Sequence, residues 1–422
     1  MKYDCIIIGG GPGGATCAKI LAENNLETLL VEKNHPNRYK ACAGGLMRRN
    51  ESVFGPLPNK IIERDVDNIV FGSMNDSAVL SFKNAGIKSG KLVYRGPHDQ
   101  YLLDEAEKAG AEIKYETEAI AANYLSDGVE IIINSAGEPT KFKSASLIIA
   151  TGVGTKIPRK LGIEYPTDFV YAIQAEFDLP ENEVEEVCGG GSWEVYFSSK
   201  IANHGYAWIF SKRAGLTVGM LDKRVNRSRF DELLNKHPII SKKIENAKPK
   251  EFEGKHIWAA PIPDRICEYT YYNRILLIGD AGGFSDRTTY EGIYHARFTG
   301  KLAAETLIKA HKKNDYSTNQ LINYEKKWKR QLYNAPKQSI VSSRRQHHLF
   351  YHSGFLDLLI DSLIYAFKNE VTANKALYDM INTGEIINKG IMQNMLNYFK
   401  KKLDKKSYKH AMSELEKSIS IV

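Results

Sequence analysis

The stretch from residue 4 to residue 32 constrains the fold of this chain more than any other. It opens with an apolar, β-branched run at residues 6–8, which predicts a strand covered on both faces. Glycines with the spacing G-x-G-x-x-G follow, and after them come a helical pattern and a second strand that ends in Glu32. Together these features indicate a Rossmann-type unit that binds a dinucleotide.

Each residue of this motif has its own structural or binding role. Gly9 permits the tight turn after the strand, Gly11 lets the backbone approach a pyrophosphate, and Gly14 lets the helix pack closely on the strand. The helix start offers N–H groups and the positive end of its dipole to the phosphate, and Glu32 can accept both hydroxyls of an adenosine ribose. The expected cofactor contacts here are Gly9, Gly11, Pro12, Gly13, Gly14, Ala15, Glu32 and Lys33.

A second segment, residues 275–300, indicates that the dinucleotide is FAD. A buried strand runs into Gly279 and Asp280, and a helix is expected to begin near Glu291 and Gly292. An acid at the carboxyl end of that strand can bind the ribityl hydroxyls of a flavin, and the helix start can face the flavin pyrimidine. A single nicotinamide-binding domain would not need this second site so far downstream.

With both sites present, the chain resembles the FAD-dependent geranylgeranyl reductase family, within the broader para-hydroxybenzoate hydroxylase-like flavoproteins. A weaker match to the R-x-x-x-D-x-x-L helix start of that family is found at Arg95, Asp99 and Leu102. The stronger matches are the N-terminal fingerprint, KACAGGL at 40–46, GYAWIF at 205–210 and the segment 279–296.

Members of this family reduce isolated double bonds in isoprenoid chains, and reduced FAD supplies the hydride. The resemblance therefore implies a reductase that acts on an isoprenoid or prenylated lipid, and it implies further flavin contacts. These are Cys42, Ala43, Gly44, Arg95, Ala119, Ala150, Thr151, Gly152, Gly279, Asp280, Glu291, Gly292 and Ile293.

The resemblance places the substrate beside Gly45 and an aromatic strand. Tyr206, Trp208 and Phe210 alternate along that strand, so their side chains face the same way. They would form an apolar wall for a polyprenyl chain, and their π faces would stabilise developing positive charge. Without the resemblance, the same pattern would be interpreted as the core of a sheet.

Four positions around the expected flavin and substrate depart from the family pattern. Arg287 and Tyr290 replace a proline and a glycine, Thr151 replaces an aspartate, and Ser211 replaces a proline. We count Arg287 and Tyr290 among the expected substrate contacts. Arg287 either places a cation near the N1–C2=O edge of the flavin, raising its potential, or forms a surface salt bridge.

The implied reaction needs a hydride at one alkene carbon and a proton at the other. An isolated alkene has no carbonyl to polarise, so positioning and an acid must do most of the work. We predict Tyr290 or Cys42 as that acid, because Tyr290 replaces a glycine beside the expected flavin and Cys42 is the family candidate. The alternative for Cys42 is a small buried thiol without chemistry.

Composition is consistent with a cytoplasmic flavoenzyme. The 422 residues suffice for two or three domains. Five irregularly spaced cysteines argue against a disulfide framework, and no His/Cys cluster has the spacing of metal ligands. The chain enters a strand directly, so we expect no targeting segment, and no apolar run is long enough to span a bilayer.

The net charge of +8 is concentrated toward the C-terminus, with six lysines in residues 400–409 and a second basic group at 326–330. This surface either contacts anionic head groups at the inner face of a membrane or serves solubility alone. Nucleic acid is not expected, because no recognition motif accompanies the charge.

We expect an α/β fold (α+β overall) with three parts. Residues 1–165 and 259–320 would form a Rossmann-like FAD-binding domain, 166–258 an inserted antiparallel-sheet substrate domain, and 321–422 a helical C-terminal domain. An apolar segment at 355–367 is either a core or dimer helix, or an interfacial helix that takes lipid from a membrane.

Two other functions stay open. A flavin monooxygenase of the same broad fold would consume oxygen and need NAD(P)H, whereas an electron-transfer flavoprotein would reoxidise with a quinone whatever its tail. The sequence has no second G-x-G-x-x-G for NAD(P)H. The external donor is therefore either NAD(P)H bound transiently or a ferredoxin that meets the basic surface.

Overall fold

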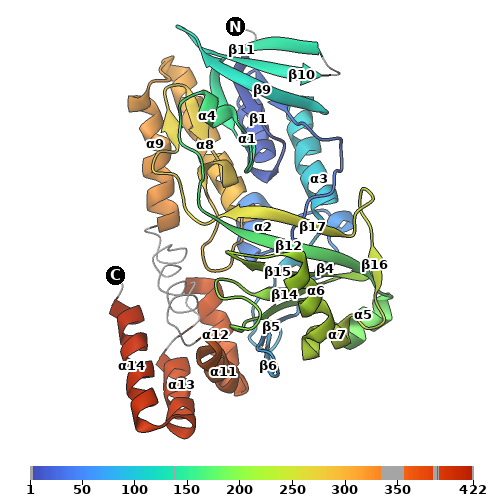
Figure 1. The fold of residues 1–422 in the computed structure, drawn as a ribbon. Coiled ribbons are helices and arrows are strands. Elements are labelled where there is room, and N and C mark those ends of the chain that lie inside the picture. Colours follow the sequence, from blue (N-terminus) through green and yellow to red (C-terminus); the bar gives the residue numbers. More distant parts are fainter. Residues whose placement is uncertain (1–2, 136–137, 334–355, 384–386, 388, 421–422) are drawn as a thin grey trace. The chain divides into compact units, whose positions relative to one another are not determined.

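The computed structural model describes residues 3–135, 138–333, 356–383, 387 and 389–420 (Figure 1). The chain divides into two compact units, each made of three segments. The first unit comprises Met1–Lys40, Arg95–Phe169 and Ile262–Tyr333. The second comprises Ala41–Tyr94, Val170–Pro261 and Asn334–Val422.

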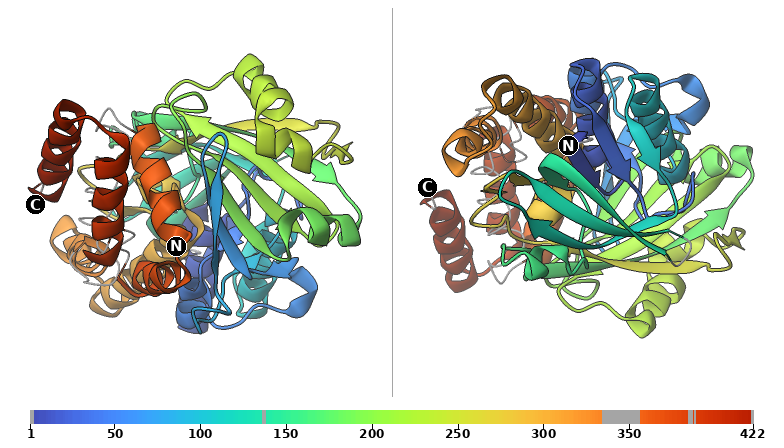
Figure 2. Two further views of the ribbon diagram at one scale, coloured as in Figure 1. Left: turned by 90° about the horizontal axis from the view of Figure 1, so that it is seen from below. Right: turned by 90° about the horizontal axis from the view of Figure 1, so that it is seen from above.

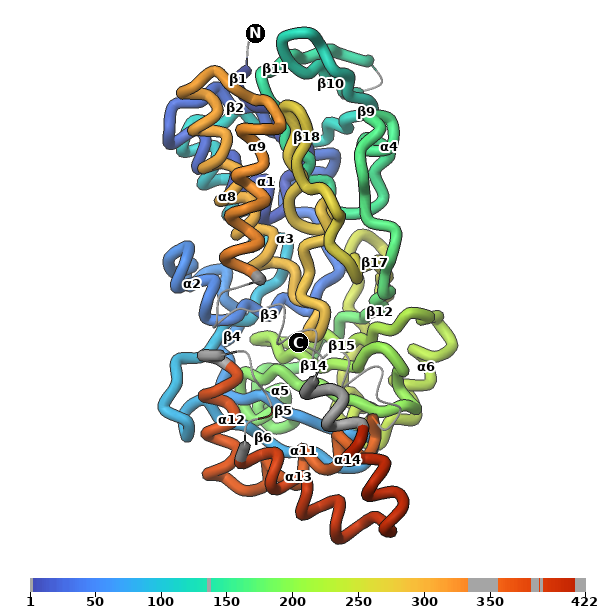
Figure 3. The backbone as a smooth tube through the Cα atoms, turned by 90° about the vertical axis from the view of Figure 1, so that its left-hand side faces the viewer, coloured from blue at the N-terminus to red at the C-terminus, as the bar shows by residue number. Residues whose placement is uncertain are grey.

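An eight-stranded sheet forms the centre of the first unit. Its strands are β1 (Tyr3–Ile8), β2 (Thr28–Val31), β8 (Glu112–Lys114), β9 (Thr117–Tyr124), β10 (Val129–Ser135), β11 (Glu138–Ile149), β18 (Tyr271–Tyr272) and β19 (Ile275–Leu277). The order is β18-β19-β11-β1-β2-β8, and the pairs from β19 to β8 are parallel. β10 pairs antiparallel with β11, and β9 pairs antiparallel with β10, so these two strands extend the sheet (Figure 3). The expected Rossmann-like architecture is confirmed.

The helices of this unit pack closely because glycines remove side chains at their contacts. They are α1 (Pro12–Glu23), α3 (Arg95–Lys108), α4 (Ile157–Lys160), α8 (Ile293–Lys313) and α9 (Thr318–Trp328), with short turns η2 (Gly279–Gly282) and η3 (Lys329–Tyr333). α1 contacts both α3 and α8. A Cβ on Gly300 of α8 would lie 2.3 Å from the carbonyl oxygen of Gly13, so α1 and α8 meet backbone to backbone.

The second unit contains a second eight-stranded sheet. Its strands are β5 (Asn68–Gly72), β6 (Ser77–Ser81), β12 (Phe169–Asp178), β13 (Ser192–Tyr196), β14 (Ala207–Lys212), β15 (Gly215–Asp222), β16 (Lys248–Lys250) and β17 (Ile257–Pro263). The order is β16-β12-β15-β14-β13-β5-β6, with β17 beside β12. β13 and β5 pair in parallel. The pairs β12–β15, β12–β16, β13–β14, β14–β15 and β5–β6 are antiparallel.

Short elements complete the second unit. A three-stranded sheet has the order β3-β7-β4, formed by β3 (Gly45–Leu46), β7 (Lys91–Leu92) and β4 (Arg64–Asp65). The helices are α2 (Arg48–Phe54), η1 (Asn59–Ile61), α5 (Glu181–Cys188), α6 (Arg227–Lys236), α7 (Pro238–Lys243), α11 (Leu356–Phe367), α12 (Glu370–Thr383), α13 (Lys389–Lys402) and α14 (Lys405–Ser420).

The apolar C-terminal helix, α11, is a core helix. It packs against α12, α13 and the β5–β6 hairpin (Figure 2), and Leu359, Ile360 and Leu363 are fully buried. Asp357 accepts hydrogen bonds from the backbone N–H (2.9 Å) and the hydroxyl of Ser199. Phe355, the first residue of the predicted segment, lies outside the described residues. Within the described part of the chain, no helix is long and apolar enough to cross a membrane.

The unit boundaries differ from the expected domain division because of two long-range contacts. β5 pairs with β13, which brings Ala41–Tyr94 into the unit of the antiparallel sheet. α11 packs on β5 and β6, so the described C-terminal helices join the same unit. α8 begins at Ile293, directly after the predicted start.

Burial of α11 predicts a large loss of stability when its core side chains are shortened. We expect Leu363→Ala to lower the free energy of unfolding by about 2–5 kcal/mol, measured by urea denaturation. Val371→Ala on α12 is the control, because Val371 is 79% exposed and its change should cost less than about 0.5 kcal/mol. Equal effects of the two changes would contradict a core position for α11.

Candidate functional site

Two close backbone contacts shape the turn after β1. Gly9 has a φ of 108°, in the left-handed region, and a Cβ on it would lie 2.4 Å from the carbonyl oxygen of Ala150. A Cβ on Gly14 would lie 2.0 Å from the carbonyl oxygen of Gly9. Only glycine therefore lets α1 approach the turn this closely.

Gly11 differs from these two glycines because open space faces it. A Cβ added to Gly11 would meet no atom within 4 Å. Gly11 is also the N-cap residue of α1, and no side chain caps this helix end. An uncapped N-terminus carries unsatisfied N–H groups and a partial positive charge, so the space beside Gly11 suits an anion such as a pyrophosphate.

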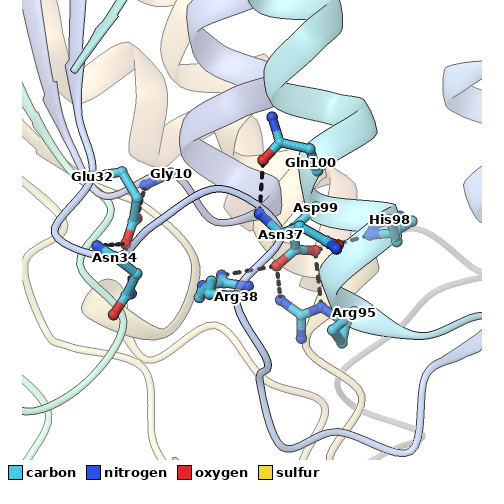
Figure 4. A network of polar contacts seen from close by, with 9 residues as sticks. All are labelled: Gly10, Glu32, Asn34, Asn37, Arg38, Arg95, His98, Asp99 and Gln100. Carbon is cyan, nitrogen blue, oxygen red and sulfur yellow. Dashed lines mark hydrogen bonds and ion pairs between the residues drawn. The ribbon is translucent and has the colours of Figure 1, made fainter. Parts of the chain in front are cut away.

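Glu32 is buried and held in place by three hydrogen bonds (Figure 4). The Gly10 N–H donates to Oε2 at 2.6 Å, and Asn34 donates to Oε1 from its backbone N–H (2.9 Å) and from Nδ2 (2.6 Å). A carboxylate offers about four acceptor positions, so Glu32 keeps room for a further hydroxyl donor. The pattern of the sequence did not identify Asn34, because no motif marks its side chain.

A buried ion network joins the start of α3 to the loop after β2 (Figure 4). Arg95 donates to both carboxylate oxygens of Asp99, from Nε at 2.9 Å and from Nη2 at 2.8 Å. Arg38 Nη2 lies 2.9 Å from Asp99 Oδ2, and His98 Nδ1 lies 2.9 Å from Oδ1. Burial alone would raise the pKa of Asp99, but Arg95, His98 and Arg38 hold it well below its usual value.

Asp280 and the start of α8 lie together, as the second segment of the sequence predicts. A Cβ on Gly292, the N-cap residue of α8, would lie 3.3 Å from Asp280 Oδ1. Burial raises the pKa of Asp280, and the charges of Lys40 and Arg95 oppose that rise. Asp280 keeps a partly exposed face, so it can accept hydrogen bonds from a bound hydroxyl group.

The end of β11 borders the turn after β1. The Ala150 N–H donates to the carbonyl oxygen of Ile8 at 2.9 Å, and Gly152 has a φ of 67° with open space where a Cβ would stand. Ala119 of β9 packs on the apolar core beside the sheet. The Lys33 side chain is exposed.

Tyr290 occupies a left-handed backbone position (φ 53°), where the family has a glycine. Its buried hydroxyl donates to Asp264 Oδ1 at 3.2 Å, and Arg287 Nε lies 3.5 Å from the same oxygen. Asp264 is itself buried, so this is a salt bridge from a 34% exposed arginine to an interior carboxylate. That carboxylate offsets part of the guanidinium charge that was expected to act on the flavin.

The aromatic row lies on the face of β14 opposite the main core of the second unit. Ala207 and Ile209 belong to that core, whereas Tyr206 and Trp208 pack edge to face at 6.1 Å on the other side. Tyr206 precedes the strand, which begins at Ala207. A Cβ on Gly45 would lie 2.7 Å from the Phe210 ring.

The predicted site residues are divided between the two units. The second unit contains Cys42, Ala43, Gly44, Gly45, Tyr206, Trp208 and Phe210. The first contains the fingerprint, Glu32, Arg95, Asp280 and the other expected cofactor contacts, together with Arg287 and Tyr290. Among the described residues, no group of three or more His, Cys, Asp or Glu side chains could hold a metal ion.

Comparison with known proteins identifies the relatives of this chain. A family model described as pyridine nucleotide-disulphide oxidoreductase matches residues 3–236. The digeranylgeranylglycerophospholipid reductase of Methanocaldococcus jannaschii is 30% identical over 78% of this chain and 83% of the relative. The chain belongs to the geranylgeranyl reductase family. The enzyme of the same name from Methanosarcina acetivorans is 29% identical over 94% of this chain and 96% of its own.

Solved structures agree with the fold of this geranylgeranyl reductase family member. A geranylgeranyl bacteriochlorophyll reductase-like protein from Thermoplasma acidophilum superposes with a TM-score of 0.72 at 22% identity, covering 98% of this chain and 99% of that one. The flavin-dependent halogenase CmlS gives a TM-score of 0.67 at 18% identity, covering 95% of this chain and 78% of its own.

The first unit of this reductase family member fits FAD. The open space at Gly11 and the uncapped start of α1 would hold the pyrophosphate, and Glu32 would hold the adenosine ribose. Asp280, beside the uncapped start of α8, would hold the ribityl chain. The five cysteines are free in this structure.

The contrast between Gly11 and Gly14 predicts two different defects. Gly11→Val should leave the apoprotein folded but weaken FAD binding by about tenfold or more, because the new side chain enters the open space. Gly14→Ala should instead destabilise the apoprotein, because its Cβ would collide with the Gly9 carbonyl. FAD titration by flavin fluorescence and thermal unfolding of the apoprotein measure the two effects. Unchanged FAD affinity in Gly11→Val would contradict the assigned pyrophosphate site.

Proposed function

We propose that this protein saturates isolated C=C bonds in the geranylgeranyl chains of a membrane-lipid precursor, as an FAD-dependent reductase. The observation that carries the proposal is its 30% identity to a digeranylgeranylglycerophospholipid reductase over most of both chains. The glycine turn, Glu32 and Asp280 support the same conclusion, because they would supply contacts for the pyrophosphate, the adenosine ribose and the ribityl chain of FAD.

When bound and reduced, FAD supplies the hydride from its N5 atom. The protein must supply the rest, since an isolated alkene offers no carbonyl that a residue could polarise. Tyr206, Trp208 and Phe210 lie on the side of β14 opposite the main core of the second unit and would hold the apolar chain. Their π faces would favour the positive charge that develops on the alkene carbon that takes the hydride, as the other carbon is protonated.

Cys42 is the better candidate for the proton donor. It is the one cysteine that is partly exposed, whereas Cys5, Cys17, Cys188 and Cys267 are buried and burial raises the pKa of each. Tyr290 is less suited, because its hydroxyl already donates to Asp264 and would have to leave that carboxylate to protonate a substrate.

Variants of the two residues separate these roles. Cys42→Ser should slow single-turnover lipid reduction by about 10²–10⁴-fold, because a serine hydroxyl is a much weaker acid. Tyr290→Phe should keep most of the rate while lowering the free energy of unfolding by about 1–3 kcal/mol, since Asp264 loses a buried donor. Rapid-mixing absorbance and denaturant titration measure these effects. Full rates in both variants would place the donor elsewhere.

The proposed reaction is tested by anaerobic single turnover. Protein with dithionite-reduced FAD is mixed with an unsaturated geranylgeranyl phospholipid, and flavin absorbance is followed. Reoxidation that depends on the lipid supports the reductase. A flavin that stays reduced until oxygen or a quinone is admitted would instead indicate a monooxygenase or an electron-transfer protein.

The external reductant is either NAD(P)H, bound transiently, or a ferredoxin that meets the basic surface. The second basic group is partly neutralised, because Lys327 pairs with Glu305 and Lys329 with Glu325. Comparing the anaerobic rates of flavin reduction by NADPH, NADH and reduced ferredoxin distinguishes the two donors.

The lysines at residues 400–409 support peripheral contact with an anionic membrane, which would place a cytoplasmic enzyme at its lipid substrate. All six are exposed, at the end of α13 and the start of α14, and among the described residues none pairs with a carboxylate. A lysine near an anionic surface contributes about 1 kcal/mol to binding.

Charge removal tests this contact. We expect the protein to co-sediment with phosphatidylglycerol vesicles at low salt, and we expect Lys→Gln changes at 400, 401 and 402 to weaken this binding by about tenfold or more. Lys→Gln changes at 108, 236 and 242 make a control of equal charge, on helices elsewhere in the chain. Equal loss in both triple variants, or no binding by the wild type, would leave solubility as the role of the lysines.

A further inference from the structure

Lys212 is a buried lysine that forms no ion pair with any residue that the structure describes. It ends β14 and is 1% exposed, and its Nζ donates to the carbonyl oxygens of Ala43 (2.6 Å) and Val93 (3.1 Å). The ammonium also lies over the Tyr94 ring, 5.3 Å from its centroid. No carboxylate of the described residues lies within 4 Å of Nζ. Lysine is rarely buried unless it is paired, so the burial of Lys212 requires an explanation.

One of the two carbonyl groups belongs to the residue after Cys42, and the other belongs to a residue that is hydrogen-bonded to the same loop. Ala43 directly follows Cys42, and Gly44 has a φ of 71° and accepts a hydrogen bond from the Val93 N–H at 2.9 Å. A Cβ on Gly44 would lie 3.1 Å from Lys212 Nζ. Lys212 therefore fixes the loop that carries Cys42, by holding the carbonyl next to it.

Three acidic groups act on the Lys212 ammonium. Burial lowers the pKa of Lys212, and Glu176 of β12, Cys42 and Glu63 oppose that effect. Glu176 accepts hydrogen bonds from Gln174 (2.9 Å) and Thr217 (2.6 Å), and the Glu63 carboxylate accepts one from the Arg213 N–H at 3.2 Å. Burial raises the pKa of Tyr94, so its hydroxyl stays neutral. Both carboxylates thus have other partners, and Cys42 is the group whose charge would change in a reaction.

We propose that Lys212 is a positioning residue that holds the Cys42 loop and stabilises the Cys42 thiolate formed when the thiol protonates the substrate. In this step the S–H bond breaks, a C–H bond forms at the alkene carbon opposite the one that took the hydride, and sulfur keeps the electron pair. Water then returns a proton to the sulfur. This inference rests on the proposed function, because it assigns a partner to the proposed acid.

Alkylation of Cys42 tests the proposal without substrate. Because the other four cysteines are buried, iodoacetamide should label Cys42 in the holoenzyme, and mass spectrometry identifies the site. We expect Lys212→Met to slow this labelling at neutral pH by about tenfold or more, since an opposite charge nearby favours the thiolate. Lys212→Arg keeps the charge and should restore most of the rate.

Lys250→Met is the matched control. Lys250 lies over the same Tyr94 ring at 5.6 Å, but its ammonium pairs with Asp178 at 2.7 Å. Its removal should leave labelling unchanged. Equal labelling rates in wild type and Lys212→Met would overturn the proposal.

A second measurement avoids any change at Lys212. Coupling is reciprocal, so the titration midpoint of the Lys212 amine, followed by NMR with labelled lysine, should fall in Cys42→Ser relative to wild type. An unchanged midpoint would overturn the proposal even if Lys212→Met does not fold. Failure of the proposed function would give a different result. Lipid that is never reduced would rule out that function, whereas slower labelling of Cys42 in Lys212→Met would still show that Lys212 and Cys42 are coupled.

Discussion

The close approach of α1 to the turn after β1 is the contact on which the proposed cofactor site of the first unit depends. It exists because Gly14 has no side chain to meet the Gly9 carbonyl, and because Gly13 allows α8 to pack against α1 from the other side. This contact aims the uncapped N-terminus of α1 at the open space beside Gly11. It also brings the Gly10 N–H within hydrogen-bond distance of Glu32, so one backbone arrangement would position both the proposed phosphate contact and the proposed ribose contact.

Buried charges are stabilised in three different ways in this molecule. Asp99 is surrounded by two guanidinium groups and His98, and it ties α3 to the loop after β2. Asp264 holds Tyr290 in a left-handed conformation that costs a non-glycine residue about 1–2 kcal/mol. The close partners of Lys212 within the described part of the chain are two carbonyl groups and a ring. The least compensated of the three charges is the one beside the proposed acid.

The sequence predicts the parts of this structure that local pattern determines. The fingerprint, both buried strands of the cofactor unit and the antiparallel sheet are where the spacing of glycines and apolar residues places them. The place of residues 41–94 could not be predicted, because it depends on the pairing of β5 with a strand far along the chain. Asp264 was missed for a similar reason, since its partners lie on another loop. Lys212 could have been identified from the sequence, because this charged residue continues the alternation of Tyr206, Trp208 and Phe210 along one face of the strand.

Mass spectrometry of the lipid recovered after anaerobic turnover distinguishes a reductase of isolated double bonds from a monooxygenase or an electron-transfer protein. We expect the lipid to gain two hydrogen atoms for each flavin oxidised, with no oxygen incorporated, and we expect Gly11→Val protein without FAD to yield unchanged lipid. A lipid that gains an oxygen atom only when air is admitted, or that is recovered unchanged while the flavin is oxidised by a quinone, would contradict the assignment as a reductase of isolated double bonds.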